Sequence, residues 1–314
     1  MYRNMTTAVV IPAYNEELLI RRTVEGIPDF VDCIIVVNDA STDATLSVLS
    51  DIESDHPNMT ILSNRENLGI GGSLKAGFDY VIENTASSAV GIVPGDNQFD
   101  CSFLQPMLDE LIDEKLDYVK ACRFFDREAL KTMPTYRRLG NILISLLTKF
   151  STGYYSVTDI TDTCGWLRRT TLEQVNFAIV RERYDFEVSF LTALSIVGGK
   201  VKDHATPTYY GEETSNINLF GTVLRNLRAV WVGFWQRIYY KYVLFSFHPI
   251  ALLLFCGLLS SAIGAGFGIF ILIIKITQDL TPSTGTVMLT VVPFVLGFQL
   301  LLTALIMDAS NEGK

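Results

Sequence analysis

The stretch AVVIPAYNE, residues 8–16, decides how the chain is expected to fold. Ala8–Ile11 is a short apolar run that ends at Pro12, as in a strand buried on both faces. Helical spacing of Leu19, Ile20 and Val24 follows within Glu16–Gly26. A buried strand that passes straight into an amphipathic helix is the repeating unit of an α/β sheet.

The same alternation continues to about residue 121. Apolar runs predict further strands at Cys33–Val37, Met59–Leu62, Ala89–Val93 and Tyr118–Ala121. The segments between them predict helices near Asp43–Ile52, Gly71–Ile82 and Leu104–Leu111, the first of them capped by Ser41 or Thr42. We therefore expect a mostly parallel, doubly wound α/β sheet, whose ligands bind beyond the carboxyl ends of the strands.

The composition changes near Tyr242. Beyond it, formal charge is confined to Lys275, Asp279, Asp308, Glu312 and Lys314. Residues 250–274 and 287–307 are uncharged, and each run is long enough to cross the roughly 30 Å hydrocarbon core of a bilayer. A turn that contains Pro282 and Gly285 separates them. These features predict a hairpin of two transmembrane helices; buried helices of a soluble domain are the alternative.

The segment before the first span is expected to lie at the membrane interface. It mixes basic and aromatic residues: Arg225, Arg228, Arg237 and Lys241 with Trp231, Trp235, Tyr239, Tyr240 and Tyr242. The positive-inside rule then predicts a multi-pass protein of the cell membrane whose large domain is cytoplasmic, and the short apolar run at the N-terminus does not fit a signal peptide. The predicted parts are a large domain over 1–215, an interfacial segment over 216–241 and a membrane part over 242–314.

The overall charge and the cysteines exclude some partners. A net charge of −9 argues against nucleic acid, because phosphate backbones require basic patches. The five cysteines form no close pair and the three histidines are isolated in sequence, so neither a zinc site nor a disulfide framework is predicted.

Four polar segments follow predicted strands. They are PAYNE at residues 12–16, NDASTD at 38–43, NLGIGGSLKAG at 67–77 and PGDNQF at 94–99. Together, and in this order, they resemble the sequence elements of family 2 glycosyltransferases. The resemblance covers about residues 6–215. It implies a GT-A nucleotide-diphospho-sugar transferase fold and hexosyltransferase activity.

The resemblance implies a donor site in the first two segments. Pro12, Ala13 and Tyr14 can wrap the nucleotide base, while Glu16 and Asp39 supply fixed acceptors for base N–H groups or ribose hydroxyls. A helix N-cap is the alternative role for Asp39.

The glycine segment does not fit a dinucleotide fingerprint, because Leu74 stands where a third glycine is required. It is expected to pack closely under the nucleotide. Lys75 either faces a phosphate or is an ordinary solvated lysine.

Asp96 is the strongest catalytic candidate. The resemblance implies that it binds a divalent metal, Mg²⁺ or Mn²⁺, which neutralises the diphosphate leaving group, with Gln98 beside it. Pro94 stands where many relatives carry a first aspartate, so fewer protein ligands are expected. The alternative role for Asp96 is that of a turn former.

Two later segments concern the acceptor. Residues 159–166, DITDTCGW, resemble the family's D-x-x-S-G-F element with shifted spacing, which leaves Asp159 and Asp162 as alternatives for the aspartate near acceptor and sugar. Arg168 and Arg169 match the basic pair that usually follows. The RYDFE string at 183–187 supplies further acidic candidates.

Residues 207–217 resemble an element of dolichyl- and polyprenyl-phosphate sugar synthases. Tyr209 and Asn216 replace the arginine and lysine found there. We expect other arginines to bind the acceptor phosphate: Arg168, Arg169, Arg225 or Arg228.

These features favour inverting transfer of a hexose from a nucleotide-diphosphate sugar to dolichyl or polyprenyl phosphate at the cytoplasmic face, for protein glycosylation or surface glycan synthesis. A phosphate oxygen is already an anion and needs no strong base. One alternative acceptor is a sugar hydroxyl of a lipid-linked glycan or glycolipid, with Asp159, Asp162 or Asp185 as base. The other alternative is a non-catalytic membrane subunit that binds nucleotide sugars.

Overall fold

The computed structural model describes residues 1–122, 135–159, 162–183, 185–207, 219–244, 248–278 and 281–312. In the helices that begin at 135 and 219, side chains are described from residues 142 and 226 onward. The chain divides into two compact units, Met1–Arg237 and Ile238–Glu312. The first therefore includes most of the segment that the sequence predicts to be interfacial.

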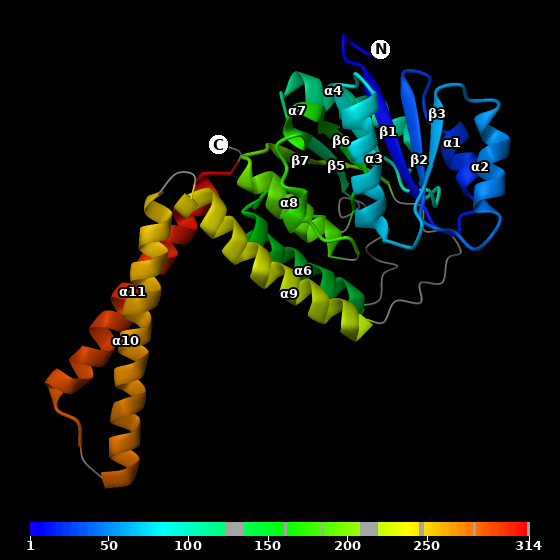
Figure 1. Ribbon diagram of the computed structural model, residues 1–314. Helices are drawn as coiled ribbons and strands as arrows, with labels where there is room; N and C mark the ends of the chain where they lie inside the picture. The colour runs from blue at the N-terminus through cyan, green and yellow to red at the C-terminus, as the bar shows by residue number, and fades with distance from the viewer. Residues whose placement is uncertain are drawn as a thin grey trace. The chain divides into compact units, whose positions relative to one another are not determined.

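The first unit is built on a seven-stranded sheet of order β3-β2-β1-β4-β6-β5-β7 (Figure 1). The strands are β1 Thr7–Ala13, β2 Cys33–Asn38, β3 Met59–Ser63, β4 Ala89–Ile92, β5 Tyr118–Cys122, β6 Gly165–Arg168 and β7 Val201–Ala205. All run in one direction except β6, which is antiparallel to both β4 and β5. The predicted mostly parallel α/β sheet and its first five strands are confirmed.

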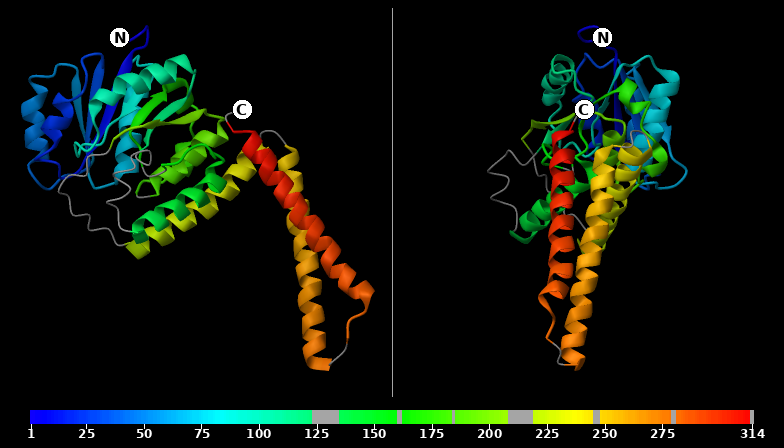
Figure 2. Two further views of the ribbon diagram at one scale, coloured as in Figure 1. Left: turned by 180° about the vertical axis from the view of Figure 1, so that it is seen from behind. Right: turned by 90° about the vertical axis from the view of Figure 1, so that its left-hand side faces the viewer.

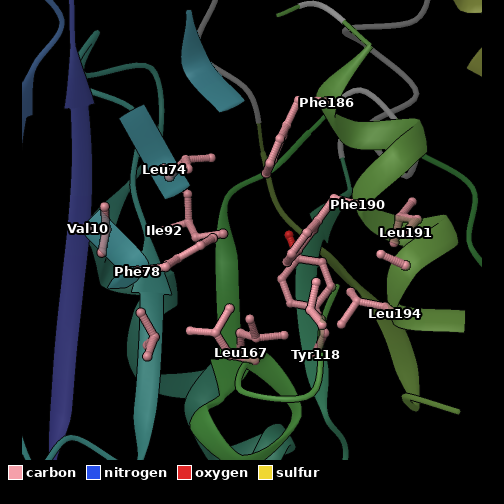
Figure 3. Close-up of a cluster of buried hydrophobic side chains, with 14 of the residues drawn as sticks. Val10, Leu74, Phe78, Ile92, Tyr118, Leu167, Phe186, Phe190, Leu191 and Leu194 are labelled. Atoms are coloured by element: carbon pink, nitrogen blue, oxygen red, sulfur yellow. The ribbon is translucent and has the colours of Figure 1, made fainter. Parts of the chain in front are cut away.

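Helices cover both faces of this sheet. They are α1 Ile20–Glu25, α2 Thr45–Glu53, α3 Ile70–Asn84, α4 Leu104–Asp113, α6 Thr135–Thr152, α7 Arg169–Leu172, α8 Phe186–Ile196 and α9 Leu219–Arg237, with 3₁₀ turns η1 Cys101–Phe103 and η3 Phe177–Ile179. Successive residues of β1 alternate between two buried clusters: Val10 packs with α3 and α8 (Figure 3), and Val9 with α1, α2 and α4. This alternation explains why the strand is apolar throughout.

The glycines of α3 allow the helix to lie close against its neighbours. A Cβ at Gly77 would collide with the Val10 side chain of β1, and one at Gly71 would collide with the Arg181 carbonyl. Gly71 and Gly72 also donate their N–H groups to the Glu182 carbonyl, at 2.8 and 3.2 Å. The close packing predicted for these glycines is therefore confirmed, and their position under a nucleotide stays a prediction.

The second unit consists of a π-helical turn, η4 Ile238–Leu244, and two long helices, α10 Pro249–Gln278 and α11 Thr284–Ser310. The long helices form a hairpin and lie side by side in both views of Figure 2. Each has a window of mean hydropathy 2.2 of which only 11% is buried, so by length and composition they suit a membrane, whereas helices of a soluble core would be mostly buried.

Small residues bring the two long helices together. Gly264 of α10 faces the backbone of α11 so closely that a Cβ would lie 2.6 Å from the Phe294 nitrogen. Ser260 donates a hydrogen bond of 2.8 Å to the carbonyl of Pro293, the proline inside α11. Small residues and hydroxyls at the contact are typical of helix pairs in membranes.

A polar bond closes the base of the hairpin. The Tyr242 hydroxyl donates to Asp308 Oδ1 at 2.5 Å, and both side chains are buried. The bond ties η4 to the last turns of α11. It also accounts for one of the few charged residues beyond Tyr242, because a buried carboxylate requires hydrogen-bond donors.

Substitution of Gly77 by valine tests the packing of α3 on β1. We expect Gly77→Val to lower the free energy of unfolding by about 1–3 kcal/mol, because the new side chain forces α3 away from Val10. Chemical unfolding followed by circular dichroism measures this. Ala76→Val is the control, since Ala76 is a half-buried neighbour on the same helix; equal losses in the two variants would contradict the explanation.

Candidate active site

The loops that follow β1 and β2 are joined to each other. Asn15 takes a left-handed conformation, φ 58°, and its side-chain oxygen accepts the Thr42 N–H at 2.8 Å. The Asn15 N–H donates to Ser41 Oγ at 3.0 Å. The prediction that Ser41 or Thr42 caps α2 is therefore wrong, because these residues serve the joint between the loops. Asp43 accepts the Thr45 N–H at the start of α2 instead, at 3.0 Å.

Asp39 organises the next loop. It is 3% exposed; Oδ1 accepts from Leu68 N at 2.9 Å and Asn64 Nδ2 at 2.7 Å, and Oδ2 accepts from Gly69 N at 2.8 Å. The alternative role as a helix N-cap is wrong, since α2 begins only at Thr45. Asp39 holds the segment before α3 against the end of β2.

These loops enclose a cavity of about 310 Å³. Its lining residues are Pro12, Ala13, Tyr14, Glu16, Asp39, Asn67, Gly69, Ile70, Ser73, Pro94, Gly95, Asp96 and Arg183. The structure thus brings together every residue that the sequence assigns to the donor except Lys75. Lys75 is exposed on α3, where its charge acts on Asp79.

Arg183 is the residue of this cavity that sequence reasoning missed. It is the one cation among the described lining residues, and its Nη2 donates to the Asn67 carbonyl at 3.3 Å. It reaches the cavity because the start of α3 binds the Glu182 carbonyl. That contact joins positions more than a hundred residues apart, and no local pattern in the sequence indicates it.

A second cavity of about 200 Å³ adjoins the first and shares Ile70, Pro94 and Asp96 with it. Its lining residues are Ile70, Pro94, Asp96, Gln98, Phe99, Asp162, Thr163, Cys164, Glu187, Thr206 and Pro207. Of the two alternative aspartates, Asp162 lines this cavity, whereas Asp159 is fully buried and lines neither. Glu187, in the first turn of α8, adds a third carboxylate to Asp96 and Asp162.

Asp96 lies where the two cavities meet. It follows β4, and its Oδ1 accepts the Gln98 N–H at 3.1 Å across a turn in which Asn97 has φ 54°. Asp96 thus shapes the turn and also lines both cavities. Within the described residues no group of three or more His, Cys, Asp and Glu side chains could hold a metal. A carboxylate and an amide oxygen suit Mg²⁺ or Mn²⁺ only if a ligand supplies further oxygens.

Two predicted acceptor-phosphate residues lie away from the cavities. Arg168 pairs with Ala89, the first residue of β4, and is therefore at the opposite end of the strands from Asp96. Its Nη2 donates to the Leu111 carbonyl of α4 at 2.8 Å, and Arg169 Nη2 donates to the Ile82 carbonyl of α3 at 2.7 Å. Both guanidinium groups bind helix carbonyls.

The two remaining acceptor candidates belong to α9. Arg228 is exposed on α9 and lines neither cavity. The side chain of Arg225 and residues 208–217, which include Tyr209 and Asn216, lie outside the described residues.

The cysteine of the second cavity is not a nucleophile. Burial, with the neighbouring Asp162 carboxylate, raises the pKa of the Cys164 thiol well above its usual range. Burial also raises the pKa of Cys101 to about 11. Both thiols are therefore protonated at physiological pH.

The sheet is mostly parallel, and two adjoining cavities lie at the carboxyl ends of β1, β2 and β4. Arg183 lines one cavity and Asp96 lines both. This is the arrangement of a nucleotide-sugar transferase of the GT-A fold. Residues 8–175 match glycosyl transferase family 2, and the chain belongs to this family.

Relatives with assigned activities act on lipid phosphates. The chain is 26% identical over 193 residues to a UDP-N-acetylglucosamine–dolichyl-phosphate N-acetylglucosaminyltransferase of Methanococcus voltae, covering 56% of this chain and 75% of the relative. It is 26% identical over 251 residues to an undecaprenyl-phosphate mannosyltransferase of Micrococcus luteus, covering 74% and 99%. It is 27% identical over 208 residues to a dolichyl-phosphate beta-glucosyltransferase of Drosophila melanogaster, covering 60% and 62%.

The fold is also that of a solved glycosyltransferase. Glucosyl-3-phosphoglycerate synthase from Mycobacterium tuberculosis, in complex with UDP, superposes with a TM-score of 0.54 at 19% identity, covering 73% of this chain and 80% of that one. Another structure of the same enzyme contains Mn²⁺ and UDP-glucose. The GT-A fold expected from the sequence is confirmed. The family 2 match confirms the assignment as a glycosyltransferase enzyme.

Substitution of Asp39 by asparagine tests its role as an organiser. The amide nitrogen cannot accept a hydrogen bond, so one N–H group of the 64–69 segment loses its acceptor. We expect Asp39→Asn to lower the free energy of unfolding by about 1–3 kcal/mol, measured in denaturant. Asp51→Asn, at an exposed position of α2, is the matched control and should change stability little; equal effects would refute the assigned role.

Proposed function

We propose that the chain transfers a hexose, with inversion, from a nucleotide-diphosphate sugar to dolichyl or polyprenyl phosphate at the cytoplasmic face of the cell membrane. The observation that carries the proposal is the meeting of two cavities at Asp96, in a family 2 chain that also has two candidate membrane spans. In-line attack from the second cavity on a sugar held at the first inverts the anomeric carbon. The product then serves protein glycosylation or surface glycan synthesis.

The first cavity suits the nucleotide. Pro12, Ala13 and Tyr14 form an apolar wall for the base, and the half-exposed Tyr14 ring provides a stacking face. Glu16 and Asp39 supply carboxylate acceptors for base or ribose donors. Arg183 supplies positive charge for the diphosphate.

Neutralising the leaving diphosphate requires more positive charge than Arg183 alone provides. Asp96 and Gln98 are the residues that would hold Mg²⁺ or Mn²⁺, with diphosphate oxygens completing the ligand set. A bound divalent ion supplies electrostatic stabilisation of the leaving group. The metal-containing complexes of the mycobacterial fold neighbour support this part of the proposal.

The relatives' activities support a lipid phosphate as acceptor. One observation favours the alternative, a sugar hydroxyl on a lipid-linked glycan. The described lining of the second cavity includes Asp96, Asp162 and Glu187 but no Lys, Arg or His. A hydroxyl acceptor needs a base and no phosphate-binding cation, and Asp162 is placed to act as that base.

A transfer assay separates these acceptors. Membranes that contain the chain are given labelled GDP-mannose, UDP-glucose or UDP-N-acetylglucosamine in turn, with polyprenyl phosphate and Mg²⁺ or Mn²⁺. Label in a lipid that mild acid hydrolyses identifies the donor and supports the lipid phosphate. Donor binding without such label supports a glycan hydroxyl, whereas retained anomeric configuration in the product contradicts inversion.

Substitution of Asp96 tests the metal site in the same assay. We expect Asp96→Asn to reduce transfer by roughly 100-fold or more, because stabilisation of the leaving diphosphate is lost. Asp100→Asn is the matched control. Asp100 lies in the same loop and caps η1 through Ser102 N at 2.9 Å, and it lines neither cavity. Transfer that survives Asp96→Asn would instead favour a non-catalytic subunit.

The distribution of apolar and polar residues on α6 and α9 supports attachment of the first unit to a membrane surface. The two helices pack on each other and on α8. Their outward faces are apolar, with exposed Ile142, Leu143 and Leu146 on α6 and exposed Leu227, Trp231 and Trp235 on α9. Their inward faces are polar or small, with Ser145, Thr148 and Ser151 on α6 and Asn226, Ala229 and Gly233 on α9. This distribution is the reverse of a soluble helix and suits the bilayer interface.

One predicted interfacial cation has another role. Arg237 is fully buried, and its guanidinium donates to the Ser151 and Phe150 carbonyls at the end of α6, at 2.8 and 2.9 Å. It therefore fixes α9 to α6 rather than facing lipid headgroups. The proposed cytoplasmic orientation then rests on Arg225, Arg228 and Lys241.

Tryptophan fluorescence tests this placement. Of the three tryptophans, Trp231 and Trp235 lie on the exposed face of α9, whereas Trp166 is fully buried in the sheet. In proteoliposomes with brominated phospholipids, we expect strong quenching in the wild type. Most of that quenching should disappear in Trp231→Phe/Trp235→Phe, where Trp166 alone reports. Equal quenching in the two proteins would contradict a lipid-facing α9.

A further inference from the structure

A buried ion pair joins β5 and β7. Lys120 of β5 and Asp203 of β7 are direct partners in the parallel register. Their side chains are 1% and 5% exposed, and Lys120 Nζ lies 3.6 Å from Asp203 Oδ1. Buried ion pairs contribute little net stability, because the loss of hydration offsets their attraction. The position of this pair therefore calls for a role other than stability.

The pair holds one peptide segment from both sides. Lys120 Nζ donates to the Asp159 carbonyl and, at 3.1 Å, to the Ala121 carbonyl. Asp203 Oδ2 accepts the Thr158 N–H at 2.5 Å and the Asp159 N–H at 3.4 Å. The Lys120 ammonium thus binds the Asp159 carbonyl, and the Asp203 carboxylate binds the N–H groups of Thr158 and Asp159. An apolar pair could make none of these bonds.

The segment is held again just past Asp162. The Tyr118 hydroxyl, on the same strand as Lys120, donates to the Thr163 carbonyl at 2.8 Å. The Cys164 carbonyl accepts the Ala121 N–H at 2.8 Å, and the Cys164 N–H donates to Asp162 Oδ1 at 3.0 Å. Asp162 therefore lies between two anchors on β5, and it is the residue of this segment that brings a carboxylate to the second cavity.

We infer that Lys120 and Asp203 are positioning residues, which fix the Asp159 peptide so that the Asp162 carboxylate faces the second cavity. This inference rests on the proposed function, in which the acceptor or the transferred sugar occupies that cavity. The pair touches neither cavity and so acts through the main chain. The identity of this segment's functional aspartate thus depends on a lysine in a strand that is otherwise mostly apolar.

The test uses the full chain in proteoliposomes and the variant Lys120→Met/Asp203→Asn. It removes both charges and the donor to Asp159, while the asparagine oxygen can still accept the Thr158 N–H. The matched control is Lys202→Met/Glu114→Gln, which removes an exposed ion pair of 2.6 Å from the neighbouring position of β7. We expect the buried-pair variant to lose about tenfold or more in kcat, with the donor KM changed less than about twofold. The control should keep both values.

A double-mutant cycle with Asp162→Asn separates positioning from general damage. If the pair acts through Asp162, the loss caused by Asp162→Asn should be much smaller in the buried-pair variant than in the wild type. Multiplicative losses would overturn the inference. Asp203→Asn alone, which keeps Lys120 and its bond to the Asp159 carbonyl, is the variant to use in the cycle if the double substitution does not fold.

Hydrogen exchange measured by mass spectrometry gives a readout that needs no activity. Amides in peptides that cover 158–164 should exchange about tenfold faster in the buried-pair variant, while peptides that cover 64–69 should not change. Unaltered exchange over 158–164 would overturn the inference even if transfer fell. If the wild type transfers no sugar to any acceptor, the proposed function fails, and the exchange result still decides whether the pair holds this segment.

Discussion

The site depends first on the Asp39 carboxylate and the three N–H groups that it binds. These bonds fix Leu68 and Gly69, and Gly69 has φ 83°, a conformation that favours glycine. Helix α3 begins directly afterwards, and its first free amides bind the Glu182 carbonyl. Arg183 reaches the first cavity and Ile70 reaches both cavities as a result. A single buried anion thus orders loops that are distant in sequence into one binding surface.

Where local pattern decides structure, sequence was sufficient. The five strands up to Tyr118–Cys122 are short, mostly apolar runs; β3, at the edge of the sheet, is partly buried, and the other four are almost wholly buried. Polar residues that follow β2 and β4 line the cavities, as Asp39 and Asp96 do. The strands β6 and β7 escaped prediction for identifiable reasons. Strand β6, GWLR, is a run of four residues that begins with glycine and ends with arginine, and β7, VKDHA, is an edge strand with charged side chains.

Residue positions that depend on contacts between distant parts of the sequence could not be predicted. Nothing near Arg168 and Arg169 in the sequence indicates that β6 runs against its neighbours and so carries both arginines to the far end of the strands. The antiparallel direction of β6 also places Gly165, and with it Asp162, at the end of the sheet where the cavities lie. The sequence leaves Asp159 and Asp162 as equal alternatives, because the distinction arises from bonds to β5 and β7. Arg183 was missed because a tertiary contact of α3, not local spacing, brings it to the cavity.

The bond between Tyr242 and Asp308 has a consequence for synthesis of the chain. Its partners are separated by 66 positions, and Asp308 lies in the last turns of α11. A ribosome completes the first unit and α10 before Asp308 exists, so Tyr242 can acquire this acceptor only after nearly all of α11 has been made. Closure of the hairpin base therefore follows the synthesis of both long helices. A chain that stops short of α11 lacks the bond that joins η4 to the hairpin.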